Sequence, residues 1–193
     1  MNYSPTTALI VVDVQNDFAD PDGSLYVAGG EETIPFINEQ IAAASESGAT
    51  IVYTRDWHPE STPHFAKDGG IWPVHCVGET WGSEFHPDLM VTGGEVKKGT
   101  SGEDGYSGFT VRDPETGTES STGLQDLLSD DGITDVIVLG LATDYCVKET
   151  ALDAVRLGFS TTLLADGVQS VNLSPGDGTR AIAEMVVAGV VVE

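Results

Sequence analysis

The chain has 193 residues, 40% of them hydrophobic, which suits one domain over residues 1–193 with a buried apolar core. Its 31 acidic and 8 basic side chains give a formal net charge of -23, which argues against binding to nucleic acid or to an anionic membrane surface. No apolar run approaches the roughly 18 residues of a membrane span, and the start has no export signal, so we expect a cytoplasmic protein. Ordinary solubility and adaptation to salt both explain the acidic composition.

Apolar runs with few interruptions predict the buried strands of a parallel sheet. In chain order these runs are residues 8–14, 50–54, a weaker candidate around Val96, 135–141, 161–165 and 186–192. Apolar residues at helical spacing predict helices over 33–47 and 146–157, which end at Gly48 and Gly158. Because strands and helices alternate, the sequence predicts an α/β fold with helices on both faces of the sheet.

Three long irregular stretches separate these elements, at residues 17–32, 57–95 and 99–121. Loops of this length in a compact domain are often functional. The second stretch holds all four histidines of the chain. We therefore expect the chemistry of the protein to lie where these loops meet the ends of the strands.

Three residues near strand ends are candidates for covalent chemistry. Asp13 lies near the end of the first apolar run, where a buried carboxylate needs a partner, although it also suits a turn. Cys146 follows the run 135–141 and opens the next helix, a position that lowers the pKa of a thiol, whereas a lone cysteine is often a core residue. Lys98 follows the weaker strand and either supplies a charge near the site or lies on the surface. Cys76 is interpreted as structural, and no disulfide is expected because the two cysteines lie far apart in a sequence without an export signal.

A second group of residues has the composition of a metal site. Asp56 and His58 are two residues apart after a strand, so their side chains project from the same face. His64 and His75 follow in the same loop, and this set suits zinc, iron or manganese. His86 is interpreted as an ordinary turn or surface residue.

Six motifs occur in one order along the chain, and together they resemble the nicotinamidase branch of the isochorismatase-like cysteine hydrolases. The motifs are VVDVQNDF, TRDWHP with a following HF, WPVHC, KKGT, GYSGF and LATDYCVKET. The resemblance implies a Rossmann-like three-layer α/β/α fold with a six-stranded, mostly parallel sheet. It also implies that Asp13 and Cys146 meet at adjacent strand ends, where the strand order reverses, and that Lys98 completes a catalytic triad.

The resemblance further assigns roles around this triad. It implies that Asp56, His58 and His75 bind one divalent metal ion, with His64 at a position that ligates in only some members. It implies a cis peptide between Leu141 and Ala142, which aims the amides of Ala142 and Cys146 into an oxyanion hole. The side chains implied in substrate binding are aromatic: Phe18, Trp72, Tyr106 and, at a position that differs among members, Tyr145.

The activity implied by the resemblance is hydrolysis of nicotinamide to nicotinate and ammonia, with pyrazinamide as a second substrate. Two alternatives stay open: a related hydrolase acting on another small amide, and a homologue that binds a metal or ligand without catalysis. A thiol redox protein would need a second nearby cysteine, as in Cys-x-x-Cys, and the sequence has none. The sequence also leaves open whether the protein forms a homo-oligomer.

Overall fold

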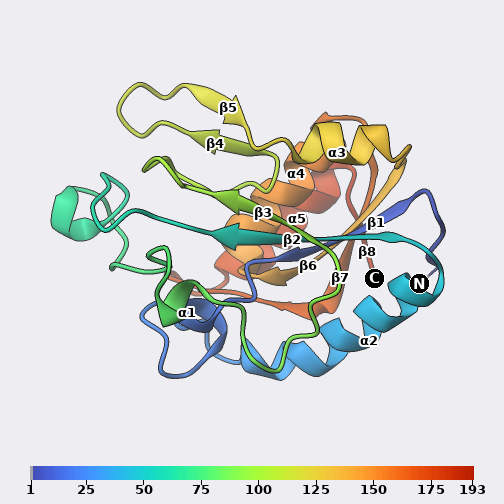
Figure 1. The fold of residues 1–193 in the computed structure, drawn as a ribbon, viewed down its shortest axis with the longest axis horizontal. Coiled ribbons are helices and arrows are strands. Elements are labelled where there is room, and N and C mark those ends of the chain that lie inside the picture. The colour runs from blue at the N-terminus through green and yellow to red at the C-terminus, as the bar shows by residue number, and fades with distance from the viewer. Residues whose placement is uncertain (1) are drawn as a thin grey trace.

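A six-stranded sheet runs through the middle of the computed structural model, which describes residues 2–193 (Figure 1). Its strands, in the order β3-β2-β1-β6-β7-β8, are β3 (Gly94–Lys98), β2 (Thr50–Asp56), β1 (Thr7–Val12), β6 (Asp135–Leu141), β7 (Ser160–Gln169) and β8 (Val191–Val192). Each pairing within the sheet is parallel. This arrangement confirms the predicted α/β class and the mostly parallel sheet.

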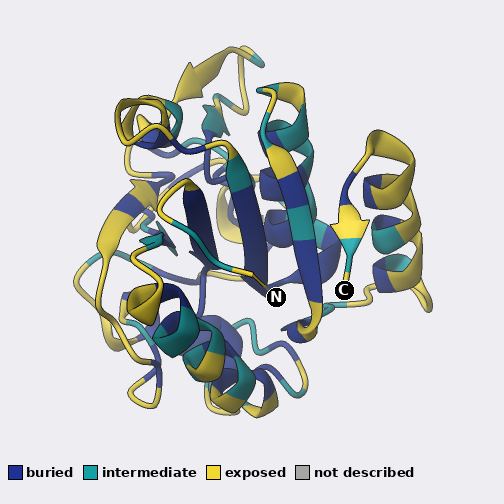
Figure 2. Ribbon diagram, turned by 90° about the vertical axis from the view of Figure 1, so that its right-hand side faces the viewer, coloured by how far each residue is buried: buried dark blue, intermediate teal, exposed yellow. Residues whose placement is uncertain are grey.

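The central strands are apolar because helices cover both faces of the sheet. Helix α2 (Ile34–Glu46) packs on β1, β2 and β7, while α4 (Lys148–Arg156) packs on β6 and β7 and against α5 (Asp177–Ala188). Figure 1 shows α2 below the strands and α3 (Leu124–Asp130) and α4 above them. All six residues of β1 are buried, so this strand does not alternate between apolar and polar residues. The buried interior between exposed outer helices is visible in Figure 2.

The two predicted helices are confirmed, with shifted boundaries. Helix α2 follows the 3-10 turn η1 (Glu31–Thr33) and buries one face, formed by Ile34, Ile37, Ile41 and Ala44. Gly48 adopts a φ of 70° after this helix, as expected for a residue that ends a helix. Helix α4 begins at Lys148, after a π-helical turn η4 (Thr143–Val147) that contains Cys146.

The prediction of a strand over 186–192 is mostly wrong. Helix α5 continues to Ala188, and only Val191 and Val192 pair with β7. The helix buries Ala181 and Met185, which are four residues apart, whereas Val187 is 89% exposed. The branched residues of this run therefore lie partly on the solvent face of a helix, and the apolar run alone does not reveal it. Helix α3 and the hairpin β4 (Thr110–Arg112) and β5 (Glu119–Ser121) were also not predicted.

The strand order reverses between β1 and β6, and this reversal creates the place for a site. Val12 lies beside Gly140 in the parallel register, so the residues that follow both strands emerge at the same edge of the sheet. Parallel α/β sheets bind ligands in the crevice at such a reversal. None of the helices within residues 2–193 has the length and apolar character needed to cross a membrane.

Candidate active site

Asp13 follows β1 directly and is fully buried beneath the crevice. Its side chain contacts neighbouring strands: Thr54 Oγ1 donates a hydrogen bond to Oδ1 over 2.6 Å, and Lys98 Nζ lies 2.7 Å from Oδ2. The carboxylate therefore does not serve as the cap of a local turn. Its φ of 49° is in the left-handed region, which aspartate tolerates better than most residues.

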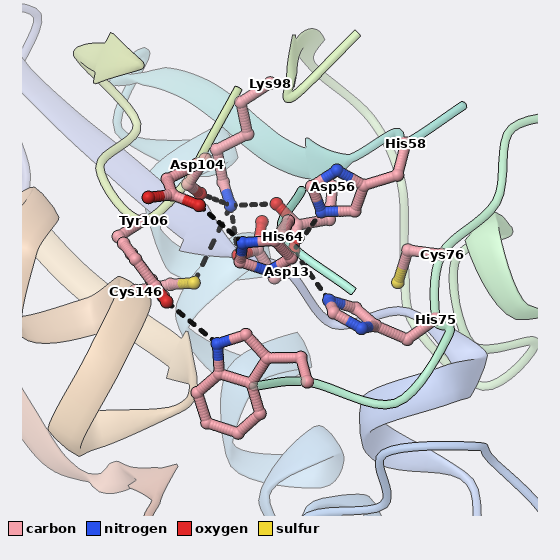
Figure 3. Close-up of polar contacts among 12 residues, drawn as sticks. Asp13, Asp56, His58, His64, His75, Cys76, Lys98, Asp104, Tyr106 and Cys146 are labelled. Carbon is pink, nitrogen blue, oxygen red and sulfur yellow. Dashed lines mark hydrogen bonds and ion pairs between the residues drawn. The ribbon is translucent and has the colours of Figure 1, made fainter. Parts of the chain in front are cut away.

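Lys98 ends β3 and is buried, so the alternative of a surface lysine is wrong. Its ammonium group donates to Asp56 Oδ1 over 2.5 Å and to the carbonyl of Gly105, and it lies 3.7 Å from Cys146 Sγ (Figure 3). Burial lowers the pKa of Lys98, but the charges of Asp13 and Asp56 outweigh this effect and raise the pKa well above its usual value. Lys98 is a permanent cation between two carboxylates.

Cys146 lies at the base of the crevice, in the π-helical turn between β6 and α4. The prediction of a lowered thiol pKa is wrong: burial raises the pKa of Cys146 well above its usual value, Lys98 opposes this, and Asp13 and Asp56 raise it further. The field of the helix terminus is outweighed because the thiol is desolvated beside two carboxylates. At neutral pH the thiol keeps its proton, and it needs a base to become a nucleophile.

Asp13 has the position and proton affinity of that base. Ligand atoms of Asp13, Asp56 and Cys146 all lie within 4.8 Å of one another. Burial raises the pKa of Asp13, Lys98 lowers it and Asp56 raises it again, with a net upward shift. A carboxylate with raised pKa next to a protonated thiol is suited to accept the proton of that thiol.

The predicted metal ligands form a compact group beside this triad. Asp56 Oδ2 lies 3.6 Å from His58 Nε2 and 3.7 Å from His75 Nε2, and His64 stacks on His58 with ring centroids 4.8 Å apart. One ring nitrogen from each of His58, His64 and His75 lies within 4.8 Å of the other two. All four side chains are buried.

The chemistry of these donors fits a divalent metal ion. Neither ring nitrogen of His58 has a hydrogen-bond partner within residues 2–193, and orphaned polar atoms in a buried site are costly unless a ligand satisfies them. His75 Nδ1 donates to the carbonyl of Pro73 over 2.7 Å, which leaves Nε2 free on the side of Asp56. Burial lowers the pKa of His58, which favours the neutral imidazole that binds metals.

Asp56 joins the metal group to the triad. Burial raises the pKa of its carboxyl group, but the charge of Lys98 and the neighbouring imidazoles of His58 and His75 lower it well below the usual range. The group is therefore ionised, with Oδ1 on Lys98 and Oδ2 facing the histidines.

A pocket opens above Cys146 and the metal group, and its walls are mostly apolar. Trp72 Nε1 donates to the hydroxyl of Tyr106 over 2.8 Å, and the ring edge of Trp72 meets Tyr145 at a centroid distance of 4.8 Å. All four predicted aromatic residues line this pocket, together with Ala142: Phe18, Trp72, Tyr106 and Tyr145. A pocket with aromatic walls and a few polar groups at its base is suited to a small flat molecule.

The peptide between Leu141 and Ala142 is cis, as the resemblance implied. The carbonyl of Ala142 accepts hydrogen bonds from the amides of Tyr145 and Val147. Ala142 and Cys146 both line the pocket. Their role as donors of an oxyanion hole stays a prediction.

Several supporting residues were missed by the sequence analysis. The side chain of Gln15 pairs with both backbone groups of Asp56, accepting from its N–H over 2.7 Å and donating to its carbonyl over 2.8 Å. Asp17 Oδ2 accepts a hydrogen bond from the amide of Cys76 over 2.7 Å and thereby holds the residue that follows His75. The only signal in the sequence was an unusual density of polar residues after a buried strand, which equally suits a turn.

For His86 the surface alternative is wrong, whereas the turn alternative holds, since its carbonyl accepts a hydrogen bond from the amide of Leu89 over 3.0 Å. The side chain of His86 is buried. Its Nδ1 accepts a hydrogen bond from the amide of Asp88 over 3.2 Å, and its Nε2 lies 3.8 Å from Asp20 Oδ2. It is not part of the group formed by His58, His64 and His75. Cys76 is buried, with its thiol 3.7 Å from the carbonyl of Gly82, in agreement with a structural role.

Comparison with known proteins agrees with this geometry. The isochorismatase domain model matches residues 7–193. A nicotinamidase of Escherichia coli is 36% identical, over 96% of this chain and 93% of the relative. The crystal structure of a pyrazinamidase of Pyrococcus horikoshii in complex with zinc aligns with a TM-score of 0.86 and 43% identity, over 98% of this chain and 99% of that one. The structure of PnC1 from L. infantum in complex with nicotinate gives a TM-score of 0.88 and 38% identity, over 100% of this chain and 95% of that one.

Proposed function

This chain belongs to the isochorismatase domain family, and we propose that it is a metal-dependent nicotinamidase that also hydrolyses pyrazinamide. The observation that carries the proposal is the meeting of Asp13, Lys98 and Cys146 at the base of a pocket with aromatic walls. Similar proteins described as a nicotinamidase, a pyrazinamidase and a nicotinate complex support the choice of substrate.

The reaction begins with the thiol of Cys146, whose raised pKa leaves it protonated. Asp13 takes this proton, and Lys98 stabilises the charges that result. The sulfur then attacks the carboxamide carbon, and the amides of Ala142 and Cys146 hold the negative oxygen of the tetrahedral intermediate. The carbon–nitrogen bond breaks as protonated Asp13 returns its proton to the departing ammonia, which leaves a thioester.

Hydrolysis of this thioester completes the cycle. Asp13, now ionised, accepts a proton from water as the oxygen of water attacks the thioester carbon, and the proton then returns to the sulfur as the carbon–sulfur bond breaks. Asp56, His58, His75 and His64 would hold the divalent ion, which we propose to be zinc, iron or manganese. When bound, such an ion supplies an attachment point for the pyridine nitrogen or a more acidic water molecule.

Of the two alternatives, a homologue without catalytic activity is disfavoured by the close approach of all three triad residues. Hydrolysis of another small amide is the stronger alternative, because the pocket walls bear few polar groups that would select one ring over another. Location in the cytoplasm, one domain over residues 1–193 and assembly into a homo-oligomer stay predictions.

The test is release of ammonia from nicotinamide, pyrazinamide and benzamide by the purified, metal-loaded protein. Cys146→Ala is expected to abolish release, and Cys76→Ala, which removes the other buried cysteine, should retain most of the activity. Chelation should reduce the rate strongly, with recovery when a divalent ion is restored. Full activity in Cys146→Ala would contradict the mechanism. Absence of ammonia release from all three amides would rule out nicotinamide and pyrazinamide as substrates.

A further inference from the structure

The carboxylate of Asp104 lies beside the outer nitrogen of His64, one of the four residues in the metal group. The distance from Asp104 Oδ1 to His64 Nδ1 is 2.7 Å, and Figure 3 shows this contact at the edge of the site. An ionised carboxylate only accepts hydrogen bonds, so Nδ1 of His64 carries the hydrogen. Nε2 is then unprotonated and is the nitrogen of His64 left for a ligand role.

Both partners of this contact are held by the main chain. The backbone of Asp104 pairs with that of Arg112 in β4. The amide of Asp104 donates to the carbonyl of Arg112 over 2.8 Å, and the amide of Arg112 donates to the carbonyl of Asp104 over 3.0 Å. On the other side, the amide of His64 donates to Thr62 Oγ1 over 3.2 Å, and the hydroxyl of Thr62 donates to the carbonyl of Gly102 over 2.6 Å. The main chain on both sides of the contact is therefore held in place by hydrogen bonds.

The segment 104–106 serves three parts of the site with successive residues. The side chain of Asp104 contacts His64, the carbonyl of Gly105 accepts from Lys98, and the hydroxyl of Tyr106 accepts from Trp72. A change that alters the backbone of this segment would disturb all three contacts. A change confined to the Asp104 side chain affects the contact with His64, and this makes the role of that contact testable.

We propose that Asp104 is a positioning residue that fixes the tautomer and orientation of His64 and so makes His64 the fourth protein ligand of the metal site. This inference depends on the metal site of the proposed function. A carboxylate on the outer nitrogen of a ligating histidine fixes the ring and raises the basicity of the ligand nitrogen. Asp56, His58, His64 and His75 then form a site with one carboxylate and three imidazoles.

The experiment measures the affinity of the purified protein for Zn²⁺ by competition with a chromogenic chelator. Asp104→Leu, which has no acceptor, should bind about 10- to 100-fold more weakly than the unchanged protein, as is typical of lost outer partners of metal ligands. Asp104→Asn should be intermediate, because its amide oxygen still accepts from Nδ1. The matched control is Glu103→Gln, which removes the same charge one residue away, where the Glu103 side chain accepts a hydrogen bond from the amide of Ser101.

A double-mutant cycle with His64→Ala separates positioning from a general effect on the loop. In the His64→Ala background, Asp104→Leu should cause no further loss of affinity, because its effect acts through His64. Equal affinity of Asp104→Leu and the unchanged protein, or an equal loss in both backgrounds, would overturn the role of Asp104 and leave the metal site intact. Absence of Zn²⁺ binding by the unchanged protein would overturn the metal site as well. Because the Asp104 side chain is 25% exposed, these variants are expected to fold, and circular dichroism verifies this.

Discussion

Replacement of Lys98 by methionine should destabilise the protein strongly, because this lysine separates two buried carboxylates. Its ammonium group lies 2.7 Å from Asp13 Oδ2 and 2.5 Å from Asp56 Oδ1. Methionine fills a similar volume but leaves both carboxylates without their counter-charge. Removing one partner of a buried ion pair costs roughly 3–5 kcal/mol, which is a large share of the roughly 5–15 kcal/mol that stabilises a typical domain.

The loss should depend on pH in a defined direction. The pKa of Asp13 is already raised by burial, and Lys98 lowers it, so the pKa of Asp13 rises further in the variant. A carboxyl group with a raised folded pKa binds its proton more tightly in the folded state than in the unfolded state. The linkage relation then makes the variant regain stability as the pH falls through this raised pKa, and lose it as the pH rises.

Urea unfolding of chelated protein, followed by tryptophan fluorescence at about pH 8 and about pH 5, measures both effects. Chelation is needed because a bound cation beside Asp56 would partly replace the missing charge. The matched control is Lys97→Met on the same strand, where the side chain is 36% exposed and lies 3.7 Å from Glu95. That change should cost less than about 1 kcal/mol. Equal stability of the two variants at both pH values would refute the role given to Lys98.

Three further predictions concern the base, the nucleophile and the surface. Thr54→Val removes the hydrogen bond to Asp13 Oδ1 and should lower kcat by roughly 10- to 100-fold with little change in KM. Thr54→Ser retains the bond and should retain most of the activity. Steady-state kinetics on nicotinamide measure both variants, and an unaltered kcat in Thr54→Val would contradict the prediction. The rate at which iodoacetamide alkylates Cys146, measured by mass spectrometry, should rise continuously with pH up to about pH 9, because burial raises the pKa of this thiol. A rate that reaches a plateau below neutral pH would show that Cys146 is a thiolate instead. With a net charge of -23, repulsion among the acidic side chains should lower the melting temperature in about 0.01 M salt relative to about 1 M salt, where charges are screened beyond about 3 Å. A melting temperature independent of salt would show that the acidic surface causes no net repulsion.

The sheet was predictable from the sequence because its central strands are buried on both faces. After their first residues, Thr7 and Asp135, strands β1 and β6 contain no polar side chain, and the polar residues that follow them mark the edge where the site forms. The end of α5 was not predictable in this way, because Val186 and Val187 are exposed on a helix that ends at Ala188. A run of branched residues does not distinguish this arrangement from an edge strand.

The grouping of Asp13, Lys98 and Cys146 was predictable from the motifs, but the contacts that support these residues were not. Thr54 meets Asp13 across 41 residues, and Asp104 meets His64 across 40. Such pairs depend on how distant strands and loops come together, which local spacing does not encode. The pKa of Cys146 was misjudged for the same reason: the helix terminus is local, whereas the burial and the carboxylates that raise the pKa come from β1 and β2.

The shared position of Asp56 determines how the proposed metal site can be tested. One oxygen of Asp56 binds Lys98 and the other faces His58 and His75, so substitution of Asp56 also removes one of the two carboxylates that contact Lys98. Loss of activity in Asp56→Asn therefore has two causes that kinetics alone does not separate. His75 offers a cleaner position, because its outer nitrogen binds the carbonyl of Pro73 and its inner nitrogen faces Asp56, without contact to Lys98. His75→Ala should weaken metal binding while the Lys98 pairs with Asp13 and Asp56 persist, so a loss of activity in this variant does not arise from a change at Lys98.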